Sequence, residues 1–326
     1  MRRPVLFQAM GAALVVAAAG MGASVSGSLI SGEVESGVTA PVGPGATGAR
    51  VIRAQILLAC ARFSPGEIDG RYGDDLSTAI RGYQESHALK PTGVIDAEMW
   101  KLLDAHTAPP LLVPYTVTAE DVKGPFLPIP KTAAEQAQMK WMGFESAEEG
   151  LGEKFHMSPA LLAELNPGMK PLTAGELITV VNVTRSPAGH ASRVVVSKSK
   201  RTVTAFGAGG RMLAQYPATI GGDHDPLPIG TWKITIVDRN PWFNWDPVHF
   251  WNVDPKIAAE KLPPGPNNPV GVVWMGLSKE HYGIHGTEDP GQVHHGESYG
   301  CIRLTNWDAS DLARMVVRGT PVVLEE

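Results

Sequence analysis

The spacing of apolar residues changes once along this chain of 326 residues, and no other feature constrains its fold as strongly. Between residues 49 and 105, apolar residues recur every three or four positions, which is typical of amphipathic helices. From about Arg193 onward, Val, Ile and Thr recur at period two between glycine-containing turns, which predicts β-strands. We therefore predict a multi-domain protein: a small three-helix domain, an α+β segment and a mostly β domain.

The first 25 residues have the layout of a secretory signal peptide. Arg2 and Arg3 form a positive n-region, and residues 5–19 form an apolar run. The alternative is an uncleaved membrane anchor, although the run is short for a span. Either way we expect an exported protein, with no membrane-spanning segment beyond this one. Residues 26–49, rich in Gly, Ser, Ala and Pro, predict a flexible linker.

The charge of the chain argues against a nucleic-acid partner. The net charge is -5, and Lys and Arg form no cluster along the sequence. Binding of nucleic-acid phosphates requires such clusters, so we expect no nucleic acid among the partners.

Residues 50–105 predict three short helices, the last of them capped by Asp96. The stretch SPGEIDGRYGDDLSTAIRGYQESHALKPTGVIDAEMWKLL resembles the three-helix peptidoglycan-binding domain in its DGRYG loop, its YQ pair and its TG turn. The resemblance implies a module that binds the bacterial cell wall. The residues themselves show no binding chemistry, because the loop glycines are also what tight turns require.

Residues 115–183 predict a strand over YTVTAEDV, followed by a helix, a turn and a second strand. The later part, with its LNP turn and GELI strand, resembles the end of a lysin-motif (LysM) domain, which implies binding of glycan strands. Residues 118–145 are longer than such modules have between strand and helix, and the alternative is a family-specific interdomain region. AHTAPPLLVP and TRSPAGHAS predict linkers on either side.

The β domain, residues 192–324, contains one of only two cysteines in the chain, within HHGESYGCIRL. Cys60 follows a helical pattern and is expected to be a small buried core residue. A bridge between Cys60 and Cys301 would have to join two domains far apart in sequence. We therefore expect Cys301 to be a free thiol that is kept for its reactivity, even in an oxidising compartment.

A nucleophilic cysteine needs a nearby base or cation. Gly300 permits a tight turn before the cysteine, and the backbone N–H groups of such a turn could hold an oxyanion. The candidates for the base are His281, His285, His294 and His295. The competing interpretation is a zinc site made of three histidines and the cysteine. Adjacent histidines in a strand point to opposite faces, however, and no CxxC is present.

IHGT followed by SYGCIRL resembles the catalytic motif of YkuD-type L,D-transpeptidases, and the similarity covers residues 192–324. The resemblance implies that Cys301 is the nucleophile and His285 the proton donor and acceptor. Gly286 matches the position whose backbone carbonyl orients the histidine. The other histidines have no role in the motif and are expected to be solvated loop residues.

The remaining residues that the motif assigns to the site are Gly300, with an oxyanion or orienting role, and the substrate-binding residues Ser298, Tyr299 and Arg303. Many members of the family have histidine where Tyr299 stands, a departure that is expected to tune the site without abolishing it.

The resemblance also implies the reaction. Cys301 attacks the amide between diaminopimelate and the terminal D-alanine of a peptidoglycan stem, and an amine of a second stem resolves the thioester into a 3→3 cross-link. Two acyl transfers at a thiol need no metal and no cofactor. The expected partners are stem peptides and glycan strands in the periplasm or cell-wall space. The alternatives are an L,D-carboxypeptidase or endopeptidase, and a non-catalytic wall-binding protein.

Two further expectations concern the surroundings of the cysteine. If His285 and Cys301 form an activated pair, the thiol pKa should lie below its ordinary value of about 8.5. Between Pro226 and Pro269 an aromatic-rich stretch predicts either a flap over the cleft or an ordered surface loop. Its aromatic residues are Trp232, Trp242, Phe243, Trp245, Phe250 and Trp251.

Overall fold

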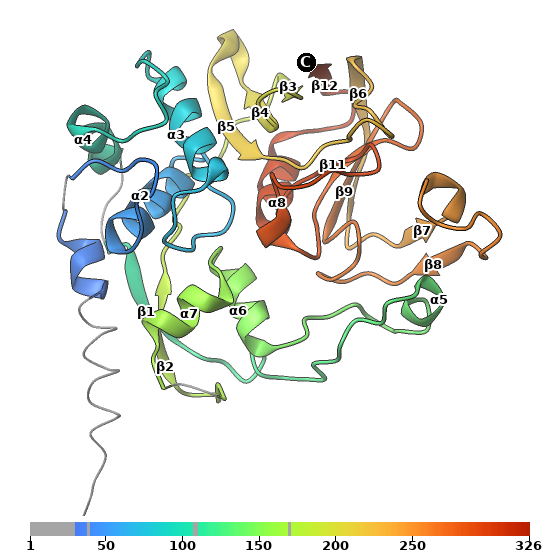
Figure 1. The fold of residues 1–326 in the computed structure, drawn as a ribbon, viewed down its shortest axis with the longest axis horizontal. Coiled ribbons are helices and arrows are strands. Elements are labelled where there is room, and N and C mark those ends of the chain that lie inside the picture. The colour runs from blue at the N-terminus through green and yellow to red at the C-terminus, as the bar shows by residue number, and fades with distance from the viewer. Residues whose placement is uncertain (1–29, 38–39, 107–109, 169–170) are drawn as a thin grey trace, which may run out of the picture.

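The computed structural model describes residues 30–37, 40–106, 110–168 and 171–326, so the predicted signal peptide lies outside the described residues. The chain forms a helical module, then an α+β segment, then a mostly β domain (Figure 1). This order confirms the predicted fold class. Within the part of the chain that is described, no helix has both the length and the apolar character needed to cross a bilayer.

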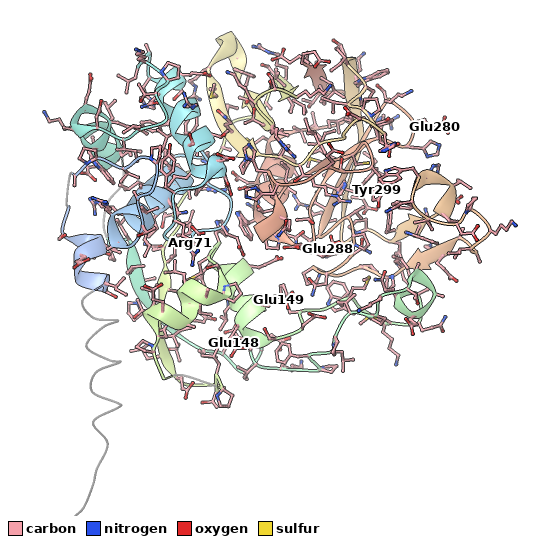
Figure 2. All side chains as sticks on the ribbon, in the orientation of Figure 1. Arg71, Glu148, Glu149, Glu280, Glu288 and Tyr299 are labelled. Atoms are coloured by element: carbon pink, nitrogen blue, oxygen red, sulfur yellow. The ribbon has the colours of Figure 1, made fainter. Side chains whose placement is uncertain are left out.

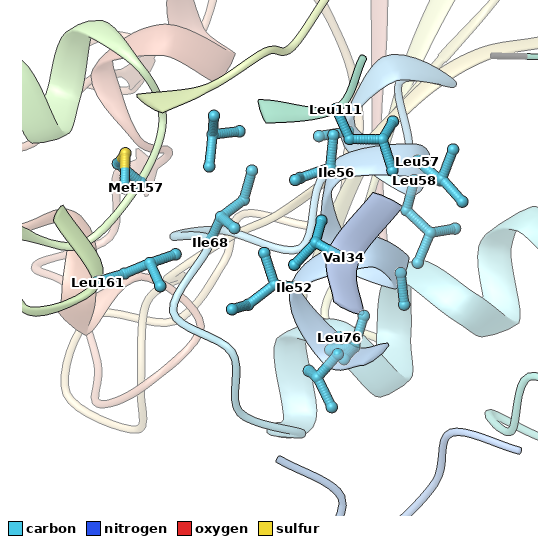
Figure 3. Packing of buried hydrophobic residues seen from close by; sticks show 14 of the residues in the cluster. Val34, Ile52, Ile56, Leu57, Leu58, Ile68, Leu76, Leu111, Met157 and Leu161 are labelled. Carbon is cyan, nitrogen blue, oxygen red and sulfur yellow. The ribbon is translucent and has the colours of Figure 1, made fainter. Parts of the chain in front are cut away.

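Residues 49–106 form three helices: α2 (Ala49–Cys60), α3 (Asp74–Ser86) and α4 (Ala97–His106). Asp96 caps α4 as predicted, because its Oδ1 accepts a hydrogen bond of 2.9 Å from the backbone N–H of Met99. The apolar residues at helical spacing face one core, in which Ile52, Ile56 and Leu76 are buried (Figure 3). The helical period therefore corresponds to the buried faces of the helices.

The predicted flexible linker over residues 26–49 is wrong for most of its described part. Val34 is fully buried in the core of the helical module. The indole Nε1 of Trp100 donates a hydrogen bond of 3.0 Å to the carbonyl of Ala40. These contacts hold the segment against the module, and a composition rich in small residues does not reveal them.

The α+β segment consists of two strands with helices between them: β1 (Leu112–Thr116), α5 (Ala133–Gln136), α6 (Ala147–Lys154), α7 (Pro159–Leu165) and β2 (Leu177–Val181). The strands pair antiparallel, Leu112 opposite Val181. β1 begins inside the predicted linker AHTAPPLLVP and ends at Thr116, well before the end of the predicted strand. Met157 belongs to the same apolar core as the helical module (Figure 3), so the two regions pack as one body.

The long stretch between β1 and α6 crosses to the β domain. In Figure 1, α5 lies beside β8. The backbone N–H of Met142 donates a hydrogen bond of 2.9 Å to the carbonyl of Pro264. This stretch is the region that is too long for a LysM-like module, and its extra length is used to contact the β domain.

The β domain is built on one curled sheet of eight strands in the order β11-β10-β9-β6-β12-β3-β4-β5. The strands are β3 (Arg193–Ser197), β4 (Thr202–Phe206), β5 (Met212–Pro217), β6 (Gly230–Arg239), β9 (Val273–Leu277), β10 (Gly283–His285), β11 (Ile302–Arg303) and β12 (Pro321–Glu325). A separate hairpin joins β7 (Phe243–Trp245) to β8 (Glu260–Leu262). Helix α8 (Asn306–Met315) packs on β9 and β10 and begins three residues before the predicted helix.

Buried charges on α8 tie the helical module and the predicted linker TRSPAGHAS to the β domain. Asp311 forms ion pairs of 3.0 Å with Arg62 of the helical module and with Arg185, which lies in the predicted linker TRSPAGHAS. Arg185 also lies 3.7 Å from Asp308, whose carboxylate accepts a hydrogen bond of 2.5 Å from Ser64. The predicted linker is therefore anchored by a buried arginine.

Candidate active site

The motif residues meet where β10 and β11 pair in parallel. Ile284 lies opposite Ile302 and His285 opposite Arg303. Both isoleucines are buried in the core of the β domain. Since successive side chains of a strand point to opposite faces, His285, Arg303 and Cys301 share the other face. The register of two short strands thus brings together residues that are sixteen or more positions apart in the sequence.

The imidazole of His285 is buried and held on two sides. Its Nδ1 lies 2.6 Å from the carbonyl oxygen of Gly286, and its ring stacks on Trp274 with centroids 5.5 Å apart. Burial, and next the positive charge of Arg303, lower the pKa of His285 to about 3, whereas the Gly286 carbonyl acts to raise it. The imidazole is therefore neutral at neutral pH, and with Nδ1–H donating to the carbonyl, Nε2 is left as a proton acceptor.

The thiol of Cys301 is partly buried and protonated. Its Sγ lies 3.6 Å from the carbonyl oxygen of His281. Burial raises the pKa of Cys301 to about 11, against the lowering effects of a backbone hydrogen bond from Gly283 and the charge of Arg303. The expected low thiol pKa is wrong, because desolvation outweighs the nearby positive charge and His285 carries none. Thiol and imidazole are therefore both neutral at neutral pH.

Cys60 differs from the expectation as well. It lies at the end of α2 and is partly exposed, and its Sγ donates to the carbonyl of Asn182 at 3.7 Å. Burial raises its pKa. Both Cys60 and Cys301 are free thiols.

The turn before the cysteine is fixed by contacts on both sides. Gly300 has φ +91°, and a Cβ there would lie 2.9 Å from the ring of Tyr282. The hydroxyl of Ser298 donates a hydrogen bond to the carbonyl of Cys301. The backbone N–H of Ser298 donates a hydrogen bond of 3.0 Å to the carbonyl of Ile220. Only glycine fits at position 300 without strain, and the Ser298 hydroxyl is engaged in holding the turn.

Arg303 supplies a positive charge beside the cysteine, and this charge also acts on the buried carboxyl of Glu288. Its backbone pairs with Thr219 in both directions, at 3.0 and 2.8 Å. Its Nε is buried without a hydrogen-bond partner, and none of the ion pairs among residues 30–37, 40–106, 110–168 and 171–326 includes it. A buried donor of this kind suits an anionic ligand group.

The side chains of the other three histidines have different surroundings, although the backbone carbonyl of His281 contacts Cys301. His281 is exposed, and His295 points to Asp75 of the helical module at 3.6 Å. His294 is buried, with Nε2 at 3.5 Å from the carbonyl of Lys200, so the expectation of a solvated loop residue is wrong for it. In the described part of the chain, no group of three or more His, Cys, Asp or Glu side chains is arranged to hold a metal ion.

Tyr299 joins the cysteine turn to the aromatic-rich stretch. Its hydroxyl donates a hydrogen bond of 2.9 Å to Oδ1 of Asn252. Its ring packs edge to face with that of Phe250, with ring centroids 4.8 Å apart. Figure 2 shows Tyr299 on the side of the sheet that faces the β7–β8 hairpin. Trp251, 61% exposed, lies further out. The stretch packs against a residue two positions from Cys301, which favours a flap over a separate surface loop.

Three contact residues were not predicted: Trp274, Tyr282 and Asn306. A Cβ on Gly283 would lie 2.6 Å from the indole of Trp274, and one on Gly286 would lie 2.2 Å from Oδ1 of Asn306. Glycines inside a strand mark such close approaches, and this is the signal that could have pointed to crowded neighbours. It does not say which residues those neighbours are.

Comparison with known proteins agrees with this geometry. Residues 191–324 match the model of the L,D-transpeptidase catalytic domain YkuD, and residues 47–103 match the model described as "Putative peptidoglycan binding domain". "Putative L,D-transpeptidase YkuD" of Bacillus licheniformis is 31% identical over 53% of this chain and 90% of its own length. The protein of the same name in Bacillus subtilis is 31% identical over 52% of this chain and 88% of its own length.

Among solved structures, L,D-transpeptidase 3 from Mycobacterium tuberculosis with a faropenem-derived adduct aligns at 20% identity and a TM-score of 0.34, covering 46% of this chain and 67% of that one. The family assignment comes from the sequence matches. Because a relative that is 31% identical is covered over 90% of its length, and the catalytic-domain model matches the whole β domain, this chain belongs to the YkuD family and is an L,D-transpeptidase.

Proposed function

We propose that Cys301 is the nucleophile and His285 the general base of this L,D-transpeptidase. One observation carries the proposal: Nδ1 of His285 is bound to the Gly286 carbonyl at 2.6 Å on the sheet face shared with Cys301, which leaves Nε2 as the free acceptor. A neutral imidazole beside a neutral thiol is the protonation state that general-base catalysis needs.

In the proposed reaction, the thiol proton passes to Nε2 of His285 as Sγ attacks the amide carbonyl between diaminopimelate and the terminal D-alanine. The tetrahedral intermediate collapses, the C–N bond breaks, and His285 returns the proton to the leaving amine of D-alanine. A thioester on Cys301 remains. An amine of a second stem then attacks it, gives its proton to His285, and the released thiolate recovers that proton when the 3→3 cross-link is complete.

The surroundings support this chemistry. The neutral imidazole of His285 can accept the thiol proton, and the imidazolium that forms can return it to the leaving amine. We propose that the unpaired Nε of Arg303 binds a stem carboxylate and that backbone N–H groups in the turn at Gly300 hold the oxyanion. Tyr299 and the aromatic stretch beside it would cover the bound peptide.

We further propose that the regions before the catalytic domain hold the enzyme on the wall, with domain limits of 50–105 for the helical module, 115–183 for a LysM-like glycan-binding segment and 192–324 for the catalytic domain. Two cavities support this. One of about 340 Å³ on the helical module is lined by Tyr72 and Arg81. One of about 680 Å³ lies between the α+β segment and α8.

The wall-binding proposal is tested by sedimentation with purified sacculi. Arg81→Ala should reduce retention of the full chain, because it removes a charge from the smaller cavity. Lys101→Ala is the control, an exposed charge on α4 outside that cavity. Equal retention of both variants and the wild type would count against this cavity.

Export is proposed from the first 25 residues, with cleavage of the signal peptide and action in the periplasm or cell-wall space. A fusion of these residues to a reporter that is active only after export tests this. Reporter activity equal to that of a leaderless fusion would contradict export.

The activity itself is tested by mass spectrometry of muropeptides after incubation with purified enzyme. We expect 3→3 dimers from the wild type and none from Cys301→Ala or His285→Ala, both of which should remain folded. Tripeptide stems without dimers would instead indicate that water is the acceptor. A His285→Ala variant at wild-type rate would remove His285 from the mechanism.

A further inference from the structure

One polar contact between the α+β segment and the catalytic domain has no part in the reaction as proposed. Glu153, in the last turn of α6, has its carboxyl oxygens 3.0 and 3.1 Å from Nδ2 of Asn306, the first residue of α8. No ion pair among the residues that the structure describes includes Glu153. The Asn306 amide nitrogen is thus held from two sides: by this carboxyl group from another region of the chain, and by the carbonyl of Pro266, which accepts a hydrogen bond of 3.1 Å.

Asn306 is wedged against the backbone that carries the catalytic histidine. Its side chain is almost fully buried, and its Oδ1 accepts a hydrogen bond of 3.0 Å from the N–H of Val272. A Cβ on Gly286 would lie 2.2 Å from this oxygen, so the amide and the Gly286 peptide are in direct contact. A shift of the amide would therefore shift Gly286.

Gly286 in turn orients His285, because its carbonyl oxygen lies 2.6 Å from Nδ1. We infer that Glu153 is a positioning residue for His285: by holding the Asn306 amide against Gly286, it fixes the carbonyl that aims the imidazole. This inference rests on the proposed catalytic role of His285. Small displacements of a catalytic group cost large factors in rate, so loss of the contact should be measurable in the chemical step.

The chemistry of Glu153 predicts which substitutions it tolerates. Burial raises its pKa to about 8, opposed by the bond from Asn306 and reinforced by the neighbouring carboxyls of Glu149 and Glu67. At neutral pH its carboxyl is largely protonated, so it acts as a hydrogen-bond acceptor and not as a charge. An amide oxygen can replace such an acceptor, whereas a methyl group cannot.

The test compares Glu153→Ala, Glu153→Gln and the control Glu148→Ala in the full chain. Glu148 lies on the same helix (Figure 2), and within the described residues its carboxyl makes no hydrogen bond or ion pair. Acylation of Cys301 by a carbapenem gives a saturating rate and a half-saturating concentration. We expect Glu153→Ala to lower the saturating rate about tenfold at unchanged half-saturation, and Glu153→Gln and Glu148→Ala to stay within twofold of wild type.

A second readout reports the histidine directly. In protein labelled with ¹⁵N-histidine, the Nδ1–H resonance of His285 should move in Glu153→Ala and stay in place in Glu153→Gln and Glu148→Ala. A purely structural role of Glu153 would lower the melting temperature without moving this resonance in the folded protein, and that result would overturn the inference.

The remaining outcomes are also decisive. A wild-type acylation rate in Glu153→Ala, or equal slowing in Glu153→Gln, would overturn the inference. If the alanine variant does not fold, Glu153→Asp, whose carboxyl is one methylene too short to reach, takes its place under the same criteria. His285→Ala is measured in parallel: if it acylates normally, the catalytic assignment is what fails, whereas a slow His285→Ala beside a normal Glu153→Ala overturns the positioning role alone.

Discussion

Arg185→Ala should destabilise the protein far more than an arginine-to-alanine change at the surface. The Arg185 side chain is 9% exposed, and it meets Asp311 at 3.0 Å, Asp308 at 3.7 Å and the carbonyl of Ala59 at 2.8 Å. Both carboxylates are buried, at 4% and 0% exposure. Asp311 keeps Arg62 at 3.0 Å after this change, so among the described residues Asp308 is the carboxylate that loses its ion-pair partner. Leaving one charge of a buried ion pair uncompensated costs about 3–5 kcal/mol.

The same aspartate provides the control. Arg314 lies 3.9 Å from Asp311, but its side chain is 66% exposed, so Arg314→Ala should cost about 0–1 kcal/mol. Guanidinium unfolding followed by tryptophan fluorescence measures the free energy of unfolding of both variants. In thermal unfolding, the melting temperature of Arg185→Ala should fall by roughly 6–20 °C. Burial raises the pKa of Asp308 to about 6, and the charge of Arg185 acts against this rise. Without Arg185 the pKa of Asp308 should lie higher still, so its carboxyl takes up a proton more readily. The loss should therefore shrink as the pH is lowered towards 5. Equal costs for the two variants, or a cost of Arg185→Ala below about 1 kcal/mol, would refute the idea that buried charges on α8 hold the regions together.

Three further predictions concern the active site. With a thiol pKa of about 11, alkylation of Cys301 by iodoacetamide in a Cys60→Ser background should still be accelerating between pH 9 and 10, and a plateau near pH 8.5 would contradict burial as the dominant influence. Since His285 has a pKa of about 3, its imidazole accepts protons throughout the range from pH 5 to 8, so carbapenem acylation should not fall between pH 7 and 5, whereas a drop centred near 6.5 would mean an ordinary histidine. Gly286→Ala would place a Cβ 2.2 Å from Oδ1 of Asn306, so we expect a loss of about 1–3 kcal/mol in unfolding free energy and slower acylation, with unchanged values for both arguing against a tight contact there.

Some features of this protein follow from local patterns in its sequence, and others depend on contacts between residues far apart in the chain. The spacing of apolar residues alone predicts the fold class. Residues on the buried face recur about every 3.6 positions in a helix and every second position in a strand. The turn at Gly300 is also a local matter, since a backbone with φ +91° requires glycine whatever surrounds it. The IHGT and SYGCIRL motifs likewise point to Cys301 and His285 without any knowledge of the fold.

Protonation states and contacts between regions depend instead on residues that meet only after folding. A low pKa of Cys301 is the expectation if His285 and Cys301 form an activated pair, yet burial raises the pKa of Cys301 to about 11. Composition predicts a linker around Arg185, whereas the structure buries that side chain between two aspartates of α8. Glu153 and Asn306 are 153 positions apart, and no periodicity or motif links them. Desolvation and charge interactions are sums over all spatial neighbours, and a one-dimensional pattern contains only the neighbours along the chain.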